Sequence, residues 1–359
     1  MKVLLVEPWL GGSHLAWAQG LAAASQHEIT IVGLPAELWR WRLQGSAPTL
    51  AASVRTEVAR HGTPDLLLIS GMTDVAQLLG LVRIVIGPDV AVAVYQHETQ
   101  LLYPTVRADR SAVLVNWTSW LAADAVFFNS DTHRREVVEA LPGFLDSLPD
   151  HHHLDLLDEV IAKFETLPLG VDLSWVGPGD RTDNPHPVIL WPHRWEPDKA
   201  PEVFDRALAR LSAAGLTHRV VLAGEAPTVD DGMRARVAAR HGPNVVAMGP
   251  LSLPEYRDAA RTADLVVSCA RHEWFGIAVV EAVAAGSIPV VPDALAYPEV
   301  LGHRGYRAGT FGSALEAAVR AWKPQDRASA SLVRQVQRFD WSVMGPRYDR
   351  RLGELSRRR

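Results

Sequence analysis

The organisation of this chain is decided by the stretch GPGDRTDNPHPVILW, residues 177–191. Its polar part, residues 177–187, is rich in proline and glycine, as linkers between domains are. The next residues, 188–191, form an apolar run typical of a buried parallel strand. A similar run, VLLV, opens the chain at residues 3–6. Because the pattern starts twice, and because 359 residues exceed one comfortable core, we expect two domains.

Short apolar runs alternate with helical segments on both sides of the linker. Expected strands cover residues 3–6, 29–32, 66–69, 90–95, 125–128, 188–191, 220–223, 245–247, 265–268 and 289–291. Expected helices include residues 49–61, 201–214, 233–241 and 254–262. Such alternation predicts doubly wound parallel sheets. We therefore expect an α/β fold with two Rossmann-like domains that face each other across a cleft, and an active site in that cleft, at the carboxyl ends of the strands.

The composition narrows the class of protein. The net charge is −5, with 41 acidic and 36 basic residues, which argues against nucleic-acid binding over the whole surface but leaves a local basic site open. The single cysteine, Cys269, excludes an internal disulfide and fits a reducing compartment. No apolar run is long enough to span a bilayer, and the first residues do not read as a signal peptide. We expect a cytoplasmic protein that does not bind membranes.

The strongest local signal is RHEWFGIAVVE, residues 271–281. Gly276 is expected to open a helix, and the free N–H groups of a helix start form a site suited to a diphosphate. Glu281 could hold the hydroxyls of a ribose, or it could be a solvated helix residue. Its neighbours are apolar, so its charge needs a partner, which favours a functional role.

A second signal is WPHRWEPDK, residues 191–199. Arg194 and Lys199 could neutralise a departing nucleoside diphosphate, or they could be solvated charges of a surface loop. Gly11 and Gly12 follow the first expected strand and would permit close approach to a phosphate or a sugar, although a lone glycine pair is a weak motif. His97, at the end of another strand, could contact a sugar or be structural.

Metal ligands are not evident in the sequence. No D-x-D pair occurs, and the adjacent histidines at 151–153 would point apart on any regular element. We therefore expect no metal and no other cofactor.

Taken together, these residues resemble the retaining GT-B enzymes of glycosyltransferase family 4, which combine a glycine-rich first loop, an Arg/Lys pair and an E-x7-E motif. More closely, the chain resembles the tRNA-queuosine mannosyltransferases, and the similarity runs from the first strand to residue 299. It rests on GGSH at 11–14, WRWR at 39–42, HE at 97–98, NS at 129–130, DH at 150–151, WPHRWEPDK at 191–199 and the HE and FG pairs within 272–276.

The resemblance implies a retaining enzyme that moves mannose from GDP-mannose to queuosine in the anticodon loop of tRNA(Asp). It implies that Gly11 and Gly12 face the donor phosphates and sugar. The diphosphate would be stabilised by Arg194 and Lys199 and would accept hydrogen bonds from the backbone N–H groups of Phe275 and Gly276. Glu281 would bind the ribose, Glu273 would lie near the sugar hydroxyls, and His97 would lie beneath the anomeric carbon. On the acceptor side it implies contacts from His14, Asn129, Ser130, Asp150 and His151. Trp39, Arg40, Trp41 and Arg42 could stack on bases and hold phosphates, or pack against their own domain.

The resemblance also assigns the domains. Residues 1–176 would be the acceptor-side domain, 177–187 the linker, and 188–338 the nucleotide-sugar-binding domain. Residues 339–359 would form a helix that crosses back to the first domain, although a helix that caps the second domain alone fits the sequence equally well.

Two alternatives stay open. The same donor machinery could use another nucleotide sugar, or a lipid, glycan or small-molecule acceptor, because acceptor loops vary most. The protein could also be a non-catalytic RNA-binding relative, although the presence of Arg194, Lys199, Glu273 and Glu281 argues against this. The base of the donor nucleotide cannot be read from the sequence.

Overall fold

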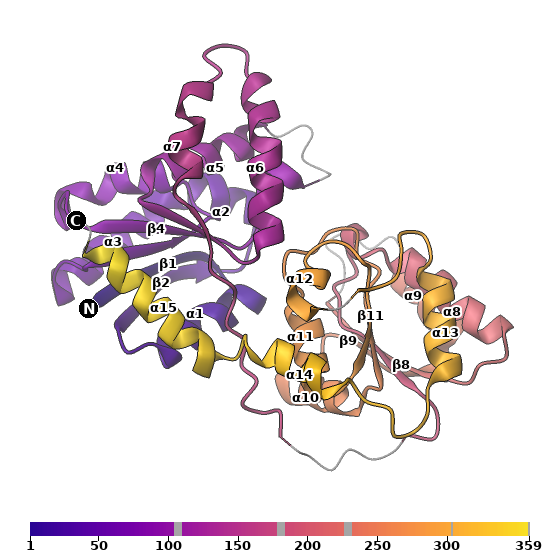
Figure 1. Ribbon diagram of the computed structural model, residues 1–359. Coiled ribbons are helices and arrows are strands. Elements are labelled where there is room, and N and C mark those ends of the chain that lie inside the picture. Colours follow the sequence, from indigo (N-terminus) through magenta and orange to yellow (C-terminus); the bar gives the residue numbers. More distant parts are fainter. Residues whose placement is uncertain (104–109, 178–183, 226–231, 303, 358–359) are drawn as a thin grey trace. The chain divides into compact units, whose positions relative to one another are not determined.

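The computed structural model describes residues 1–103, 110–177, 184–225, 232–302 and 304–357. The chain forms two compact units (Figure 1). Unit 1 comprises Met1–Val171 together with Phe339–Arg359, and unit 2 comprises Asp172–Arg338. The first boundary falls a few residues before the expected one at 176, and part of the expected linker, residues 178–183, lies outside the described residues.

Unit 1 is a six-stranded parallel sheet with helices on both faces. Its elements are β1 (Lys2–Leu10), α1 (Gly12–Ala24), β2 (Glu28–Pro35), α2 (Trp39–Gly45), α3 (Ala47–His61), β3 (Leu66–Ser70), α4 (Val75–Ile86), β4 (Ala91–Gln96), η1 (Gln100–Leu102), α5 (Arg110–Ala122), β5 (Ala125–Phe128), α6 (Asp131–Asp146), η3 (Leu154–Leu156), α7 (Leu157–Ile161), β6 (Phe164–Thr166) and α15 (Trp341–Ser356). The strand order is β2-β1-β3-β4-β5-β6. The chain leaves β1 first toward β2 and later returns to its other side with β3, so the topological switch point, where ligands bind in such sheets, lies between β1 and β3.

Both faces of this sheet are covered, which explains its continuous apolar strands. Successive strand residues point to opposite faces. On one face, Val6 and Val94 belong to a core that includes residues of α3, α4, α5 and α6. On the other face, Tyr95 meets Trp17 of α1, with ring centroids 4.5 Å apart.

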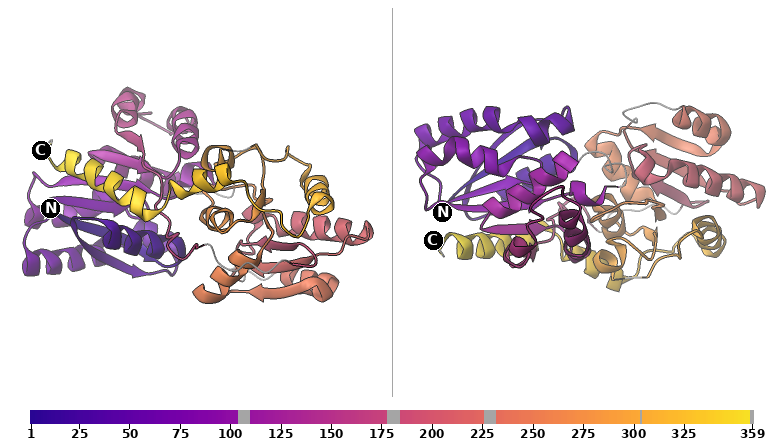
Figure 2. Two further views of the ribbon diagram at one scale, coloured as in Figure 1. Left: turned by 60° about the horizontal axis from the view of Figure 1, so that its bottom comes forward. Right: turned by 90° about the horizontal axis from the view of Figure 1, so that it is seen from above.

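Helix α15 completes the second face of unit 1, although unit 2 separates it in sequence from the rest of that unit (Figures 1 and 2). The Val171 N–H donates to Phe339 O, and the Trp341 N–H donates to Val171 O. Two glycines make room for the Trp341 indole, because a Cβ atom at Gly20 or Gly170 would lie 2.0 or 2.3 Å from it.

A buried tyrosine secures the middle of α15. The Tyr348 hydroxyl donates to Pro168 O at 3.0 Å and accepts a hydrogen bond from Trp17 Nε1 at 3.2 Å. Arg351 forms an ion pair with Glu165. α15 is therefore an integral part of unit 1.

Unit 2 is a five-stranded parallel sheet. Its elements are β7 (Val188–Trp191), η4 (Pro197–Lys199), α8 (Pro201–Ala213), β8 (Arg219–Ala223), α9 (Met233–His241), η5 (Gly242–Asn244), β9 (Val245–Gly249), α10 (Leu253–Thr262), β10 (Leu265–Val267), α11 (Ile277–Ala284), β11 (Ile288–Val290), α12 (Tyr297–Leu301), α13 (Phe311–Ala321) and α14 (Ala330–Gln337). The strand order β11-β10-β7-β8-β9 places the switch point between β7 and β10.

Each expected strand is present, and the α/β class is confirmed. Bounds differ by one to a few residues. The short strand β6 was not expected, since Phe164 is its one apolar residue. None of the helices in the described ranges is both long and apolar enough to cross a membrane.

Candidate active site

Two loops of unit 2 leave the sheet at its switch point and bring predicted residues together. One follows β7 and carries Arg194 and Lys199, and the other follows β10 and carries Glu273. Because β7 and β10 are paired in the sheet, their carboxyl ends place the two loops next to each other. Lys199 and Glu273, 74 residues apart in the chain, are in direct contact.

Lys199 donates hydrogen bonds to His272 and Glu273 and forms a further ion pair with Asp198. Its Nζ lies 2.9 Å from His272 O, 3.2 Å from Glu273 Oε2 and 3.2 Å from Asp198 Oδ2. Burial alone would lower the pKa of Lys199, but the two carboxylates outweigh burial and raise it. Burial likewise acts to raise the pKa of Glu273, and Lys199 reverses this and holds it below its usual value. Both groups are therefore charged, and a diphosphate oxygen would have to replace one of the acceptors around Nζ.

Arg194 lies on the exposed part of the same loop. Its positive charge acts to lower the pKa of Lys199, against the larger effects of the two carboxylates. The backbone of the loop is fixed by Gly224, where a Cβ atom would lie 1.7 Å from His193 O. Only glycine permits this approach, and Arg194, the next residue after His193, is exposed.

The start of α11 is occupied by a carboxylate of the protein itself. Glu273 Oε1 accepts the N–H groups of Trp274, Phe275 and Gly276 at 3.1, 3.3 and 3.0 Å. The N–H groups of Phe275 and Gly276, which were expected to face the donor diphosphate, donate here to Glu273. Their contact with a diphosphate stays a prediction. The next N–H groups, of Ile277 and Ala278, belong to the first helical turn, which has no intrahelical acceptors.

Glu281 has the partner that its apolar surroundings require. The Tyr256 hydroxyl of α10 donates to Glu281 Oε2 at 2.8 Å. Burial raises the pKa of Glu281 to about 7, against the opposing effects of Tyr256 and Arg257. Glu281 therefore gains or loses its proton near neutral pH, and a hydroxyl that donates to it would favour the charged form.

In unit 1, the two positions after β1 require glycine for different structural reasons. A Cβ atom at Gly11 would lie 2.4 Å from the Cβ atom of Ala36, so Gly11 allows the β1 and β2 ends to approach. Gly12 has a φ of +50° and nothing within 4 Å of where its Cβ atom would be. An open, left-handed position at the carboxyl end of β1 suits close approach of a ligand, and its contact with a donor stays a prediction.

His97 lies in an aromatic cage after β4. Its ring centroid is 4.1 Å from that of His14, 4.6 Å from that of Trp17 and 4.7 Å from that of Tyr95. Burial, and then the charges of His14 and His133, keep the pKa of His97 well below its usual value. His97 is therefore a neutral imidazole, which suits hydrogen bonding to a sugar.

Three residues that contact or lie beside predicted residues, one in unit 1 and two in unit 2, were not predicted. Glu7 of β1 is fully buried beside His14 and His97, Asp198 binds Lys199, and Tyr256 binds Glu281. Glu7 could have been noticed as a carboxylate that directly follows a buried apolar run, and Asp198 as the neighbour of Lys199. Nothing near Tyr256 in the sequence indicates its contact with Glu281.

Two of the expected acceptor residues are buried in structural roles. Asn129 Nδ2 donates to His97 O at 2.8 Å, and its Oδ1 accepts the Nδ1 hydrogen bond of His133 at 2.9 Å. Ser130 caps α6 by accepting the N–H of His133. Asn129 thus holds the backbone of His97, Ser130 fixes the start of α6, and their contact with an acceptor stays a prediction.

The other expected acceptor residues differ in exposure, and the His14 side chain is only 12% exposed. The Trp41 side chain is 62% exposed, and the Arg40 guanidinium lies 5.3 Å from the ring centroid of Trp39. Arg42 donates to Pro35 O. Asp150 and His151, beyond α6, are exposed, and His151 Nε2 lies 3.4 Å from Asp150 Oδ2. Arg40, Trp41, Asp150 and His151 are thus exposed, whereas Trp39 and Arg42 are half-buried.

Among the described residues, one group could offer a metal three ligand atoms. Glu7, His14 and His97 place these atoms within 4.8 Å of one another. A carboxylate and two imidazoles form a set that zinc accepts. The expectation that the protein uses no metal stays a prediction.

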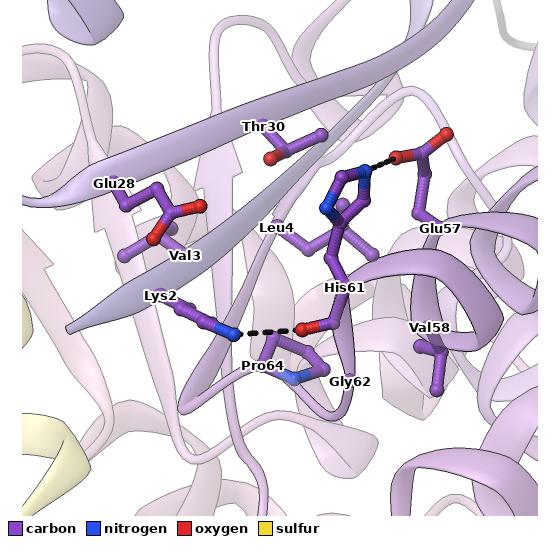
Figure 3. A pocket seen from close by; sticks show the side chains of 10 residues that line it. All are labelled: Lys2, Val3, Leu4, Glu28, Thr30, Glu57, Val58, His61, Gly62 and Pro64. Carbon is purple, nitrogen blue, oxygen red and sulfur yellow. Dashed lines mark hydrogen bonds and ion pairs between the residues drawn. The ribbon is translucent and has the colours of Figure 1, made fainter.

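A pocket in unit 1 is unrelated to these residues (Figure 3). It is lined by residues such as Lys2 and Glu28, which begin β1 and β2, and Lys2 Nζ donates to His61 O at 2.7 Å across it. This is the amino-terminal edge of the sheet, whereas ligands of open parallel sheets bind at the carboxyl edge.

Comparison with known proteins agrees with this geometry. Residues 2–171 match the family described as tRNA-queuosine alpha-mannosyltransferase N-terminal, and residues 186–322 match glycosyl transferases group 1. The chain is 30% identical over 314 residues to the tRNA-queuosine alpha-mannosyltransferase of Drosophila melanogaster, covering 83% of this chain and 81% of that protein. It is 29% identical over 211 residues to a GDP-mannose:cellobiosyl-diphosphopolyprenol alpha-mannosyltransferase of Xanthomonas oryzae, covering 54% of each.

Solved structures show the same fold at low identity. Sucrose-phosphate synthase from Thermosynechococcus elongatus superposes with a TM-score of 0.73 at 14% identity, covering 100% of both chains. Anabaena Alr3699/HepE in complex with UDP and glucose superposes with a TM-score of 0.69 at 16% identity, covering 99% of this chain and 100% of the other. The chain is thus a glycosyltransferase with two Rossmann-like domains of the GT-B type, and it belongs to the tRNA-queuosine alpha-mannosyltransferase family.

Proposed function

We propose that this protein transfers mannose from GDP-mannose to queuosine in tRNA(Asp), with retention of configuration, in the cytoplasm. The observation that carries the donor half of the proposal is the contact of Lys199 with Glu273 at the switch point of unit 2, at the start of α11. The queuosine half rests on the similarity to the Drosophila enzyme.

In this mechanism unit 2 binds the donor nucleotide. Lys199 and Arg194 neutralise the diphosphate, and the first-turn N–H groups of α11 bind one of its oxygens. Glu281 accepts the ribose hydroxyls, and Tyr256 holds its carboxylate in place. Glu273 lies within reach of the same cations and binds sugar hydroxyls.

The reaction uses positioned charge rather than a covalent step on the protein. As the bond from the anomeric carbon to the phosphate oxygen breaks, that oxygen takes the proton of the acceptor hydroxyl, which bonds to the same face of the sugar. His97 contacts the sugar as a neutral hydrogen-bonding group. Because the departing charge meets two cations and helix N–H groups, the proposal needs no metal ion, and addition of a chelator should leave the rate unchanged.

The direct test is incubation of the protein with queuosine-containing tRNA and GDP-mannose, followed by mass spectrometry of the digested nucleosides. The expected product is queuosine with one added hexose. The same tRNA lacking queuosine is the acceptor control, and UDP-glucose, UDP-galactose and GDP-glucose are the donor controls. A hexose added from another donor would refute GDP-mannose, and donor hydrolysis without tRNA product would refute the acceptor.

A further inference from the structure

Glu7 is a buried acid that the mechanism above does not use. It lies on β1, before Gly11 and Gly12, and none of its surface is exposed. A carboxylate withdrawn from water is costly unless hydrogen-bond donors surround it. The identity of its donors therefore indicates what the residue does.

Both oxygens of Glu7 face N–H donors. Oε1 accepts the backbone N–H of Trp9 at 2.9 Å, and Oε2 lies 3.0 Å from His14 Nδ1. His97 Nε2 lies 3.8 Å from the same Oε2, and this buried nitrogen makes no hydrogen bond within the described part of the chain. The carboxylate thus faces both imidazoles, whose rings are 4.1 Å apart.

This arrangement determines which nitrogen of His14 carries the proton. A carboxylate only accepts hydrogen bonds, so His14 Nδ1 must donate. A neutral His14 is then the Nδ1–H tautomer, with Nε2 as its acceptor nitrogen. The same contact keeps the His14 ring against His97.

We propose that Glu7 is a positioning residue of the transfer reaction, which fixes His14 as the Nδ1–H tautomer and holds it against His97. The inference rests on the proposed function, in which His97 contacts the sugar, and on the expected contact of His14 with the acceptor. A histidine held in the wrong tautomer presents a donor where the substrate needs an acceptor, as happens when the buried acid of a catalytic triad becomes an amide.

The substitution Glu7→Gln tests this without a change of size. Its amide oxygen must face the Trp9 N–H, which can only donate, so its NH₂ group faces His14 Nδ1. We therefore expect His14 to change to the Nε2–H tautomer. Glu7→Asp keeps a carboxylate and should keep the Nδ1–H tautomer.

The tautomer can be read from the side-chain ¹⁵N shifts of the free protein by long-range ¹H–¹⁵N correlation. A His14→Gln variant assigns the His14 signal by its loss. His27, whose Nε2 lies 3.0 Å from Asp349 O, should remain the Nε2–H form throughout and serves as an internal reference. Glu28→Gln, at an exposed position of the neighbouring strand, is the control variant and should change no histidine signal.

Activity gives the second measurement. In Glu7→Gln, kcat should fall about tenfold or more, while KM for GDP-mannose changes less than about twofold. Glu7→Asp should recover part of kcat. A fold defect would instead lower the melting temperature of unit 1 and reduce active protein equally for every substrate.

Three results would overturn the inference. They are an unchanged His14 tautomer in Glu7→Gln, a normal kcat in that variant, or one equivalent of zinc in the purified protein whose removal shifts the His14 and His97 signals. Zinc held by Glu7 and His14 together would replace the hydrogen bond between them, on which the inference rests. If the wild-type protein transfers no mannose, the proposed function fails, whereas the ¹⁵N measurement still decides whether Glu7 sets the tautomer of His14.

Discussion

Glu281 is half-protonated near neutral pH, because burial raises its pKa to about 7 from a usual value of 4.5. Between these two values the folded state holds a proton that the unfolded chain has lost. Raising the pH from 4.5 through 7 therefore lowers the free energy of unfolding of unit 2.

This sign yields a prediction for Glu281→Gln. The amide cannot ionise and can still accept the Tyr256 hydrogen bond. The free energy of unfolding of the variant should therefore not decrease through this position as the pH rises. At pH 8 we expect its melting temperature to exceed that of wild type by about 3 °C or more, with a smaller difference at pH 5.5. Calorimetry at both pH values measures this, with Glu159→Gln, an exposed carboxyl, as control. An equal difference at the two pH values would contradict it.

Lys199 gives a second prediction at this scale. In Lys199→Ala the diphosphate loses its central cation, and turnover should fall about a hundredfold or more, as when one oxyanion donor is removed. The variant also leaves Glu273 without its cation, so the melting temperature is measured alongside. Lys323→Ala, at an exposed position of unit 2, is the matched control. Wild-type turnover in Lys199→Ala would remove its assigned role.

The site residues that could be predicted are those whose role is indicated by the residues next to them in the sequence. Lys199 and Glu273 stand in loops that follow apolar strands, and such loops meet at the carboxyl edge of a sheet. The partners of Glu7 and Glu281 were not predictable, because His97 and Tyr256 come from other elements, and no local pattern states which elements pack together.

At the scale of elements, the contact between Trp341 and unit 1 can be tested with one methyl group. Gly170→Ala would place a Cβ atom 2.3 Å from the indole, so Trp341 must move. We expect a loss of about 1–3 kcal/mol in the free energy of unfolding of unit 1. We also expect faster cleavage of α15 by a protease. Denaturant unfolding and limited proteolysis measure the two effects.

Gly80→Ala is the matched control, since it lies within α4 with nothing within 4 Å of its Cβ position. Alanine there should stabilise the helix by about 0.5–1 kcal/mol. A Gly170→Ala protein as stable as wild type would show that Trp341 is not tightly held.

The elements themselves were mostly readable from the sequence. Strands buried on both faces leave runs such as LLLI at 66–69, and these were located to within a few residues. The side on which α15 packs was not, because its apolar stripe would suit either domain. It is decided by contacts with residues far from α15 in sequence, among them Gly20 and Gly170, which make room for Trp341, and Trp17, which binds Tyr348.

At the scale of the whole molecule, a net charge of −5 requires any tRNA contact to be local. Arg134 and Arg135 of α6 both form ion pairs with Asp131: Arg134 Nη2 lies 2.7 Å from Oδ1, and Arg135 Nε lies 3.4 Å from Oδ2. Arg40 and Trp41 of α2 are therefore the better candidates for contact with tRNA.

We expect tRNA affinity to fall with rising salt, and the slope to decrease by about one in Arg40→Ala, as for loss of one phosphate contact. Trp41→Ala should weaken binding without changing the slope, because stacking does not release counterions. Fluorescence titration at several salt concentrations measures both. Arg60→Ala, at the amino-terminal edge of the sheet, is the control. A flat salt response would contradict the basic site.

The return of α15 to unit 1 has a consequence for biosynthesis. A ribosome makes unit 2 after most of unit 1, and it makes α15 after all of unit 2. Until α15 has been made, Trp17 and Phe127 of the first sheet and its helices lack their contacts with α15. Vectorial folding, in which each domain closes as it emerges, is therefore unavailable to unit 1. Its exposed aromatic face during elongation is where we expect a chaperone to bind.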